Sequence, residues 1–258
     1  MAYVTPTEAV ARMVETAAFK AQLPFRLLLA RGFLAGALLG YATSLSFIPQ
    51  LQGMPSLIGA LLFPVGFVLL VLLGLELVTG NFALLPMGLL ARRVRPRDLL
   101  RNWLWVYLGN LLGGLFYAVM YTQLVHDPKV TELLASIAQR KVFSYQELGL
   151  TGQLMAIGKG LLCNWMVTLG TAMAYFSSTT TGKVITMWLP IMTFFALGYE
   201  HSVVNMFVLP AALLESGTLT VSDWWVWNQV PVTIGNIIGA VALTSFPLMT
   251  YSSHVPQA

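Results

Sequence analysis

The chain has 258 residues, of which 57% are hydrophobic and only 9% are charged. Soluble domains typically carry about 25% charged residues, so this composition excludes an ordinary soluble protein and favours a membrane protein. The net charge of +4 would suggest a nucleic-acid partner in a soluble protein. Here most of the basic residues flank apolar segments, as orientation signals do, and we expect no nucleic-acid partner.

The first elements can be read from local signals. Residues 5–21 begin with Thr5 and Glu8 at capping-box spacing and with Pro6 at the first helical position. Apolar residues then recur at helical spacing, which predicts an interfacial helix on the membrane surface. The N-terminus is too polar for a cleaved signal peptide, so we expect the first spanning helix to serve as the signal. The single cysteine, Cys163, lies in an apolar run and excludes a disulfide framework or a cysteine metal site.

Six apolar segments follow, and each is long enough for a spanning helix, which needs about 20 residues. The spans are expected at about 26–47, 56–90, 103–121, 155–176, 184–214 and 226–251, the second and fifth being interrupted at 75–81 and 199–204. Five arginines between residues 92 and 101 are interpreted as a cytoplasmic anchor. Residues 123–153 are the longest polar connection.

The two interruptions are imperfect copies of each other. The first, residues 74–86, reads GLELVTGNFALLP, and the second, residues 198–210, reads GYEHSVVNMFVLP. Laid side by side without a gap, they share a glycine, a glutamate, an asparagine, a leucine and a proline. Unpaired backbone groups and buried charge each cost several kcal/mol in a membrane. Broken helices in corresponding positions of two halves indicate a transport site, so we expect a channel or transporter.

Other motifs repeat at nearly the same distance. Gly109-Asn110 matches Gly235-Asn236, and Arg31-Gly32 matches Lys159-Gly160. The sequence therefore predicts one transmembrane domain over residues 1–258, with a first repeat at about 26–121 and a second at about 155–251. Because each repeat has three spans, an odd number, the two must cross the bilayer in opposite directions. The fold class is an all-α membrane protein of six helices in two inverted repeats.

The basic residues predict the orientation of these helices. With both termini inside, ten basic residues lie on the inner side and four on the outer side, which favours that arrangement. The inner residues are Arg12, Lys20, Arg26, Arg31, Arg92, Arg93, Arg95, Arg97, Arg101 and Lys183, and the outer ones are Lys129, Arg140, Lys141 and Lys159. We expect an integral protein of the plasma (inner) membrane with both termini in the cytoplasm.

Four motifs, GLELVTGN, KGLLCNWMV, GYEHSVVNMF and PVTIGNIIG, closely resemble those of the formate/nitrite transporter family. The resemblance covers nearly the whole chain. It implies a homopentamer of aquaporin-like protomers, each with its own pore for small monovalent anions such as nitrite and formate. The paired Asn-Pro-Ala signature of aquaporins is absent from the sequence. The amino-acid sequence of the first interruption, LELVTGN, is more similar to that of nitrite-transporting members than to that of enteric formate channels.

His201 is the foremost candidate site residue. A lone histidine on an apolar face is usually a satisfied core residue, but an ionisable residue inside a membrane span is a functional candidate by default. The resemblance implies that His201 lines the pore centre and hydrogen-bonds the passing anion. Thr79 lies in the other interruption, where its hydroxyl can donate to an anion, accept from an imidazole, or satisfy loose backbone. The family has a pore-lining threonine at this position.

The remaining candidates are expected to support this pair. Glu76 and Glu200 would repel an anion, so we expect them to accept from backbone N–H groups or to pair with a cation. Asn81 and Asn205 are expected to tie down the same loops.

The resemblance also implies roles for residues farther along the chain. Asn164 and Asn236 match family positions that orient the histidine, whereas Asn110 is interpreted as packing between helices. Lys159 is either a snorkelling lysine or part of a positive vestibule that concentrates anions. The residues that match apolar constrictions of family pores are Phe63, Phe67, Val167 and Phe194.

A small anion cannot cross an apolar constriction cheaply as a charge. We therefore predict that it takes or shares a proton at His201 and passes the phenylalanine rings close to neutral. Channel-like flow and proton symport would use the same residues. Two alternatives remain, an aquaporin-like channel for neutral solutes and an intramembrane enzyme using Glu200 and His201. No paired metal-ligand spacing, nucleophile elbow or nucleotide-binding loop is found in the sequence, so we expect neither an enzyme nor a cofactor.

Overall fold

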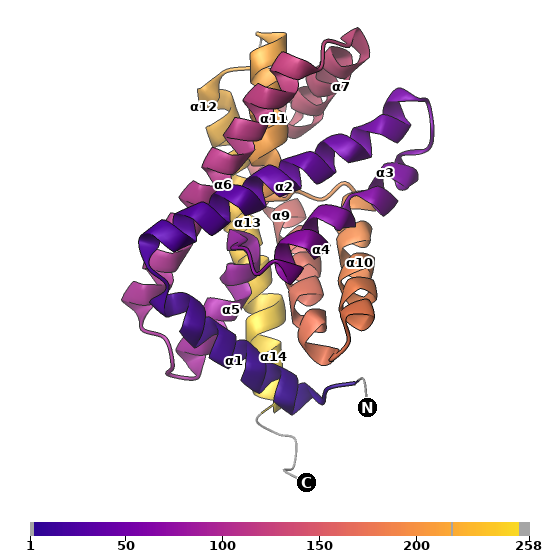
Figure 1. The fold of residues 1–258 in the computed structure, drawn as a ribbon. Helices are drawn as coiled ribbons and strands as arrows, with labels where there is room; N and C mark the ends of the chain where they lie inside the picture. The colour runs from indigo at the N-terminus through magenta and orange to yellow at the C-terminus, as the bar shows by residue number, and fades with distance from the viewer. Residues whose placement is uncertain (1–2, 218, 253–258) are drawn as a thin grey trace.

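The computed structural model describes residues 3–217 and 219–252, and within these residues it is built almost entirely of helices (Figure 1). The one β-bridge among them joins Tyr3 to Ser177. The all-helical fold class is therefore confirmed. The predicted domain also includes residues 1–2, 218 and 253–258, which lie outside the described residues.

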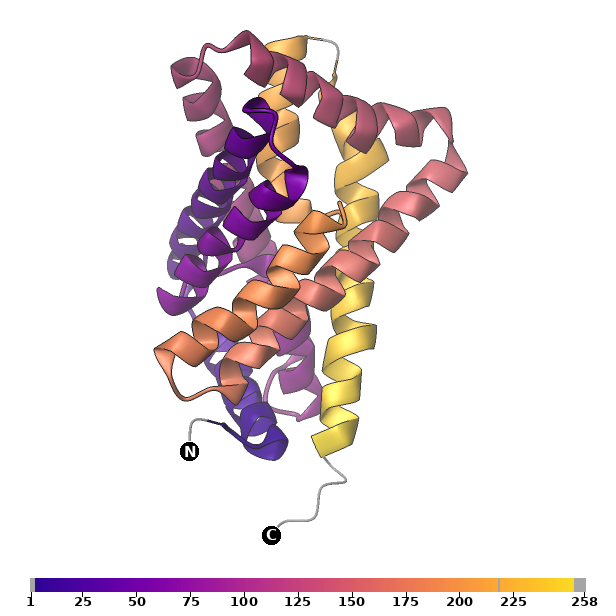
Figure 2. The same ribbon diagram turned by 90° about the vertical axis from the view of Figure 1, so that its right-hand side faces the viewer.

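The helices of the first half are α1 (Pro6–Gln22), α2 (Phe25–Leu51), α3 (Ser56–Leu62), α4 (Pro64–Leu72), α5 (Val78–Leu90) and α6 (Pro96–Leu124). Those of the second half are α7 (Pro128–Ala138), η1 (Gln139–Phe143), α8 (Ser144–Glu147), α9 (Leu150–Met173), η2 (Ala174–Phe176), α10 (Thr180–Ala196), α11 (Ser202–Ser216), α12 (Val221–Trp224), η3 (Trp225–Gln229), α13 (Val230–Ala240), η4 (Val241–Ser245) and α14 (Phe246–Ser252). The start of α1 and the end of α14 lie at the same end of the molecule (Figure 2).

Three of the described helical segments are long and apolar enough to cross a membrane by themselves. They are Phe25–Leu51, Pro96–Leu124 and Val221–Thr250. The apolar segments Ser56–Leu72, Val78–Leu90 and Ser202–Glu215 are shorter, because the chain leaves the helix between them and their neighbours.

Each interruption is a helix end made by a glycine. Gly74 and Gly198 have φ of +65° and +66°, the left-handed region that favours glycine. The N–H of Leu75 donates to the carbonyl of Leu70 at 2.9 Å, and that of Tyr199 to Phe194 at 3.1 Å. This is the Schellman pattern, which satisfies the last carbonyls of α4 and α10.

The helices resume earlier than the sequence predicted. α5 begins at Val78 and α11 at Ser202, so the interruptions span residues 73–77 and 197–201. Consequently Asn81 and Asn205, expected in loops, lie in the first turns of the resumed helices. The reason is local, because only the glycine requires a non-helical conformation and the residues after the glutamate can return to a helix at once. We call residues 73–77 the first break and 197–201 the second break.

The terminal helix α1 begins as predicted. The Thr5 hydroxyl accepts from the N–H of Glu8 at 3.4 Å, and Pro6 is the first helical residue. Its apolar face, which includes Met13 and Ala17, is buried within the molecule, and α1 packs on α5 and α6. That packing positions Lys20 for the site described below.

Residues 123–153, predicted as a polar connection, are mostly helical. Asp127 caps α7 by accepting from the N–H of Lys129 at 2.9 Å, and Pro128 occupies the first helical position. Val130 and Leu134 are buried on the inner face of α7, which packs on α11. Figure 2 shows α7 at the end of the molecule opposite α1. The segment was interpreted as a polar connection because its polar residues were counted without their helical spacing. These residues occupy only the outer face of an amphipathic helix.

Within each half, one pair of helices is in close backbone contact. α2 packs on α6, and α9 packs on α13. A side-chain carbon added at Gly113 would collide with the carbonyl of Phe33, and one at Gly239 with the carbonyl of Leu161. Small residues at these positions let the paired helices approach closely, as in other membrane proteins.

Candidate functional site

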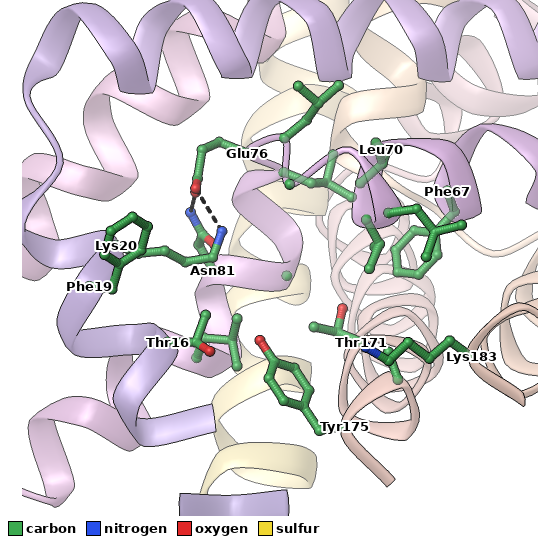
Figure 3. Close-up of a pocket in the computed structure, with 18 of the residues that line it drawn as sticks. Thr16, Phe19, Lys20, Phe67, Leu70, Glu76, Asn81, Thr171, Tyr175 and Lys183 are labelled. Carbon is green, nitrogen blue, oxygen red and sulfur yellow. Dashed lines mark hydrogen bonds and ion pairs between the residues drawn. The ribbon is translucent and has the colours of Figure 1, made fainter. Parts of the chain in front are cut away.

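The first break is fixed by a buried glutamate. Glu76 is 1% exposed, and its carboxylate accepts from the Lys20 ammonium of α1 and from the Asn81 amide, each at 2.7 Å (Figure 3). The Asn81 amide also donates to the side-chain oxygen of Asn102 at 2.9 Å. Asn102 in turn donates to the carbonyl of Lys20 at 3.1 Å. Four side chains from α1, the break, α5 and α6 therefore form one closed network.

The second break carries the same network. Glu200 is 3% exposed, and it accepts from Lys141 of η1 at 2.7 Å and from Asn205 at 2.9 Å. The Asn205 amide donates to the side-chain oxygen of Asn228 at 2.7 Å, and Asn228 donates to the carbonyl of Lys141 at 2.9 Å. Buried charges are tolerated when paired and hydrogen-bonded in this way.

Sequence reasoning missed half of each network. It expected the glutamates to find a cation or backbone donors but did not name Lys20 or Lys141, which it used only as orientation signals. It also missed Asn102 and Asn228, whose separation of 126 residues equals that of the two Gly-Asn motifs. That shared spacing was the available signal. The lysines gave none, because they lie on α1 and η1, outside the segments that repeat visibly.

Tyr145 is present in the second network alone. Its hydroxyl donates to Glu200 at 3.0 Å. Burial, followed by the nearby charge of Glu200, raises the pKa of Tyr145, so the hydroxyl keeps its proton and remains a donor. The ammonium of Lys159 lies 5.4 Å from the centre of the Tyr145 ring, within cation–π distance.

Asn110 holds the backbone of the first break. Its side-chain oxygen accepts from the N–H of Val78 at 2.9 Å. Its amide donates to the carbonyls of Gly32 and Glu76 at 2.8 and 2.9 Å. The sequence interpretation of Asn110 as packing between helices was therefore incomplete, since this residue also satisfies break groups that a helix end leaves unpaired.

Asn236 does the same for the second break. It accepts from the N–H of Ser202 at 2.9 Å and donates to the carbonyls of Gly160 and Glu200 at 2.8 and 2.9 Å. Its hydrogen bonds go to the backbone on either side of His201, so it fixes the position of that residue without a hydrogen bond to the imidazole.

His201 and Thr79 meet between the two breaks. The Nε2 atom of His201 lies 3.1 Å from the hydroxyl oxygen of Thr79. Its Nδ1 atom accepts from the N–H of Val204 at 3.2 Å, so the ring caps the start of α11. Because Nδ1 is an acceptor, the neutral imidazole carries its proton on Nε2 and donates it to the threonine. Both side chains are buried, at 3% and 0% exposure.

Asn164 joins the two breaks from α9. Its amide donates to the carbonyl of Thr79 at 3.1 Å and to that of Asn236 at 2.7 Å. Its side-chain oxygen has no hydrogen-bond partner among the described residues, although the residue is fully buried. This oxygen is a free acceptor, held by the same amide that fixes the backbone of Thr79.

Two phenylalanine rings lie beside the imidazole, one of them in direct contact with it. Phe194 stacks on His201 with a centroid distance of 5.7 Å, and Phe63 packs edge-on against Phe194 at 5.8 Å. Phe67 lines the cavity at the α1 end of the molecule, which is described below as cavity 1. Val167 is fully buried and lines neither of the two cavities described next. Of the four predicted constriction residues, Phe67 lines cavity 1 and Phe194 lines cavity 2, whereas Phe63 and Val167 are buried and line neither cavity.

Two cavities approach this site from opposite ends. Cavity 1, of about 600 Å³, lies at the α1 end and reaches Phe67 and Gly80, next to Thr79 (Figure 3). Cavity 2, of about 430 Å³, lies at the η1 end and reaches Phe194 and His201. The charged residues that line cavity 1 are Arg12, Glu15, Lys20, Arg31, Glu76 and Lys183, and those that line cavity 2 are Arg140, Lys141, Lys159 and Glu200. Basic residues outnumber acidic ones in both.

Both the sequence and the fold of this chain are similar to those of known proteins. The family model described as "Formate/nitrite transporter" matches residues 7–250. The formate channel BtFdhC of Bacillus thuringiensis is 34% identical over 95% of this chain and 95% of its own. A solved structure described as an FNT family ion channel is 27% identical, with a TM-score of 0.83 over 97% of this chain and all of the other. A pentameric formate channel with formate bound is 26% identical, with a TM-score of 0.72 over 92% and 98%.

These likenesses extend over the whole fold and over both breaks. They agree with the motif resemblance, with the apolar helices and with the paired cavities. The protein is therefore an integral membrane transport protein and not an enzyme. The chain belongs to the formate/nitrite transporter family.

Proposed function

We propose that the protein conducts small monovalent anions of weak acids, formate and nitrite, past His201. The observation that carries this proposal is the His201–Thr79 hydrogen bond, buried between two cavities in which basic residues predominate. Formate is supported further by the relative and the solved structure that are described as formate channels. Nitrite is supported by the amino-acid sequence around the first break and by the similarity of its size and charge to those of formate.

The protomer in this proposal consists of six spans in two inverted repeats, with an aquaporin-like pore of its own. The duplicated networks around Glu76 and Glu200 support the repeat, because each contains a lysine, a glutamate and two asparagines in the same hydrogen-bonding pattern. α1 and η1, the helices that supply the two lysines, lie at opposite ends of the molecule, as expected for inverted repeats (Figure 2). The similarity to a pentameric formate channel supports a homopentamer.

The orientation follows from the distribution of basic residues. The start of α1 and the end of α14 share one end of the molecule, and Val94, which lies among the arginines between α5 and α6, packs in the same apolar cluster as α1. We place that end in the cytoplasm and the protein in the plasma (inner) membrane. Cavity 1 is then the inner vestibule, and cavity 2, with Lys159 on its wall, the outer one.

The transfer step depends on the hydrogen bonds of His201. An anion that reaches the ring meets the Nε2–H group and the Thr79 hydroxyl, which together replace part of its hydration. The Nε2 proton is shared with the anion in a hydrogen bond. Complete transfer requires a second proton on the ring, because a neutral imidazole that gave up its proton would become an anion. That second proton must go to Nδ1, which then releases the N–H of Val204.

The test is uptake of formate and nitrite into liposomes that contain the purified protein, with and without an inward proton gradient. The variant is His201→Asn, because asparagine is a good helix cap and can still accept from Val204 while it removes the titratable ring. We expect the gradient to drive accumulation in the wild type and not in the variant. Equal passage by both proteins at every pH would contradict the proposal.

The same liposomes decide the alternative of a neutral-solute channel. Such a channel would pass glycerol or water at rates that do not respond to pH or membrane potential, and it would not accumulate either anion. A result of that kind, together with His201→Asn behaving as the wild type, would replace the proposal by an aquaporin-like function.

A further inference from the structure

The turn between α5 and α6 carries three arginines that have no partner within the fold. Arg92, Arg93 and Arg97 are exposed, and none of them has an ion pair or a side-chain hydrogen bond among the residues that the structure describes. The other two arginines of this segment are engaged. Arg95 pairs with an aspartate at 2.8 Å, and Arg101 donates to a carbonyl of α1 at 2.6 Å. Three charges therefore remain free at this turn.

Arg92 has a backbone conformation that is usually left to glycine. Its φ is +56°, and within the described part of the chain it is the one non-glycine residue with a positive φ. The N–H of Arg92 donates to the carbonyl of Leu89 at 2.9 Å, and that of Arg93 to the carbonyl of Gly88 at 2.8 Å. This is the Schellman pattern, in which glycine is the favoured residue. The turn therefore keeps a guanidinium at a position where glycine would be less strained.

The corresponding turn of the second half has the glycine and lacks the arginines. α11 ends at Gly217, whose φ is +62°. The connection around it, residues 215–223, contains two acidic residues and no lysine or arginine. Both turns do the same structural work, since each leads from the helix after a break into a long apolar segment. The fold itself therefore does not require the arginines, and their charges must act on what surrounds this end of the protein.

The arginine turn lies at the edge of the apolar surface. Val94 is buried in the same apolar cluster as α1, and Figure 1 shows the turn beside that helix. Arg97 is followed on α6 at helical spacing by Leu100 and Leu104, which are 62% and 55% exposed. Because α6 is long and apolar enough to cross a membrane, its first turn lies at the level of the lipid headgroups. Exposed leucines then lead from the arginines toward the level of the acyl chains.

We infer that Arg92, Arg93 and Arg97 form a docking surface for the headgroups of anionic phospholipids. A guanidinium can donate two parallel hydrogen bonds to phosphate oxygens, and the exposed leucines below it contact the acyl chains. Each basic residue close to an anionic membrane surface strengthens binding by about fivefold. A signal for orientation acts only while the chain is inserted, whereas this surface holds lipid on the folded protein. The inference does not depend on the passage of anions at His201.

The experiment measures lipid binding to the purified protein by native mass spectrometry in detergent, where the protein has no orientation in a membrane. Phosphatidylglycerol, phosphatidylcholine and inorganic phosphate are added separately. The variants are Arg92→Gly, Arg93→Gln, Arg97→Gln and the triple variant. Arg92→Gly removes the charge and also relaxes the turn, so a loss of lipid in this variant is not a loss of folding.

Two further variants serve as controls. Lys129→Gln removes an exposed charge at the start of α7, at the end of the molecule opposite α1. Asp98→Asn removes the carboxylate that pairs with Arg95, so it adds a free guanidinium to the docking surface and tests the sign of the effect.

We expect the wild type to retain phosphatidylglycerol in preference to phosphatidylcholine, and to retain no inorganic phosphate at the same concentration. Each single arginine variant should weaken phosphatidylglycerol binding about fivefold, and the triple variant about 100-fold. Lys129→Gln should change it less than about twofold, and Asp98→Asn should strengthen it. High salt should weaken binding to the wild type, because it screens exposed charges. Phosphatidylglycerol should also raise the melting temperature of the wild type and not that of the triple variant.

Several results would overturn the inference. Equal retention of both lipids by the wild type would do so, as would a triple variant that keeps phosphatidylglycerol like the wild type. Retention of inorganic phosphate as strongly as lipid would indicate an ion site instead. Loss of subunits from the triple variant, with lipid binding per chain unchanged, would assign the arginines to a contact between copies of the chain. If the wild type binds phosphatidylglycerol but transports neither formate nor nitrite, the proposed function fails and the docking surface stands.

Discussion

The two breaks share a framework but differ at the two positions that meet in the middle. Where the second break has His201, the first has Leu77, and where the first repeat has Thr79, the second has Val203. The glutamate, asparagine and lysine around them are the same in both copies. The framework is therefore duplicated because both helix ends need the same backbone support. The functional contact is not duplicated, because it consists of one imidazole from the second break and one hydroxyl from the first repeat.

The framework should respond equally in both halves when its buried charge is removed. Glu76→Ala and Glu200→Ala each leave a largely buried lysine without its partner, and each should lower the free energy of unfolding by about 3 to 5 kcal/mol. The melting temperature of the purified protein measures the loss. Glu8→Ala, which breaks the exposed pair with Arg12, is the control and should cost less than about 1 kcal/mol. A small effect at either buried glutamate would show that the halves are not equivalent.

The asparagines that hold the backbone should rank second. Asn110→Leu and Asn236→Leu keep a similar volume but each removes the side-chain partner of three backbone groups, two at the break and one on a neighbouring helix. We expect each to cost about 2 to 4 kcal/mol, since a buried unpaired group costs about 1 to 3 kcal/mol. Thermal unfolding measures both variants. If Asn110→Leu cost little while Asn236→Leu cost much, the first break would be held mainly by packing.

Formate flux should depend on the hydroxyl of Thr79 in the first repeat and not on the matching position, Val203, in the second. Thr79→Val removes the hydroxyl that faces His201 and should reduce formate flux about tenfold, equivalent to about 1.4 kcal/mol. The reciprocal change, Val203→Thr, adds a hydroxyl at the matching position, where no imidazole awaits it, and should leave flux unchanged. Liposome uptake measures both. Thr79→Ser should keep most of the flux, and a loss as large as that of valine would indicate a role in shape instead.

The smallest effect is expected from the residue that only the second network has. Tyr145→Phe removes one hydrogen bond to Glu200 and should cost about 1 to 2 kcal/mol of unfolding free energy. Because the pKa of Tyr145 is raised in the folded protein, its contribution is present in full below the unfolded value of about 10 and is lost only as pH rises through the folded pKa. The melting-temperature difference should therefore be the same at pH 5, 7 and 9. A difference that shrinks between pH 7 and 9 would contradict this.

Hydropathy and repetition were sufficient to predict the helical membrane class and the two interruptions, and they drew attention to His201 and Thr79 as candidate site residues. These features depend on local chemistry: long apolar runs, glycines that end helices, and polar residues too costly to occur in a membrane span without a reason. The separation of the Gly-Asn motifs even indicated that Asn110 and Asn236 are related. It did not reveal that both hold a break, because a backbone partner cannot be read from a spacing.

The contacts between segments that are distant in the sequence could be identified only from the tertiary structure. Lys20 and Lys141 reach the glutamates only because α1 and η1 fold back on the two helix breaks. Neither segment belongs to the duplicated sequence motifs, so these contacts could not be expected from the sequence. Lys183 resembled a surface anchor until α10 directed it into cavity 1. A charge on a chain has no fixed partner, and only the folded arrangement decides which charges cancel and which remain free to attract an anion.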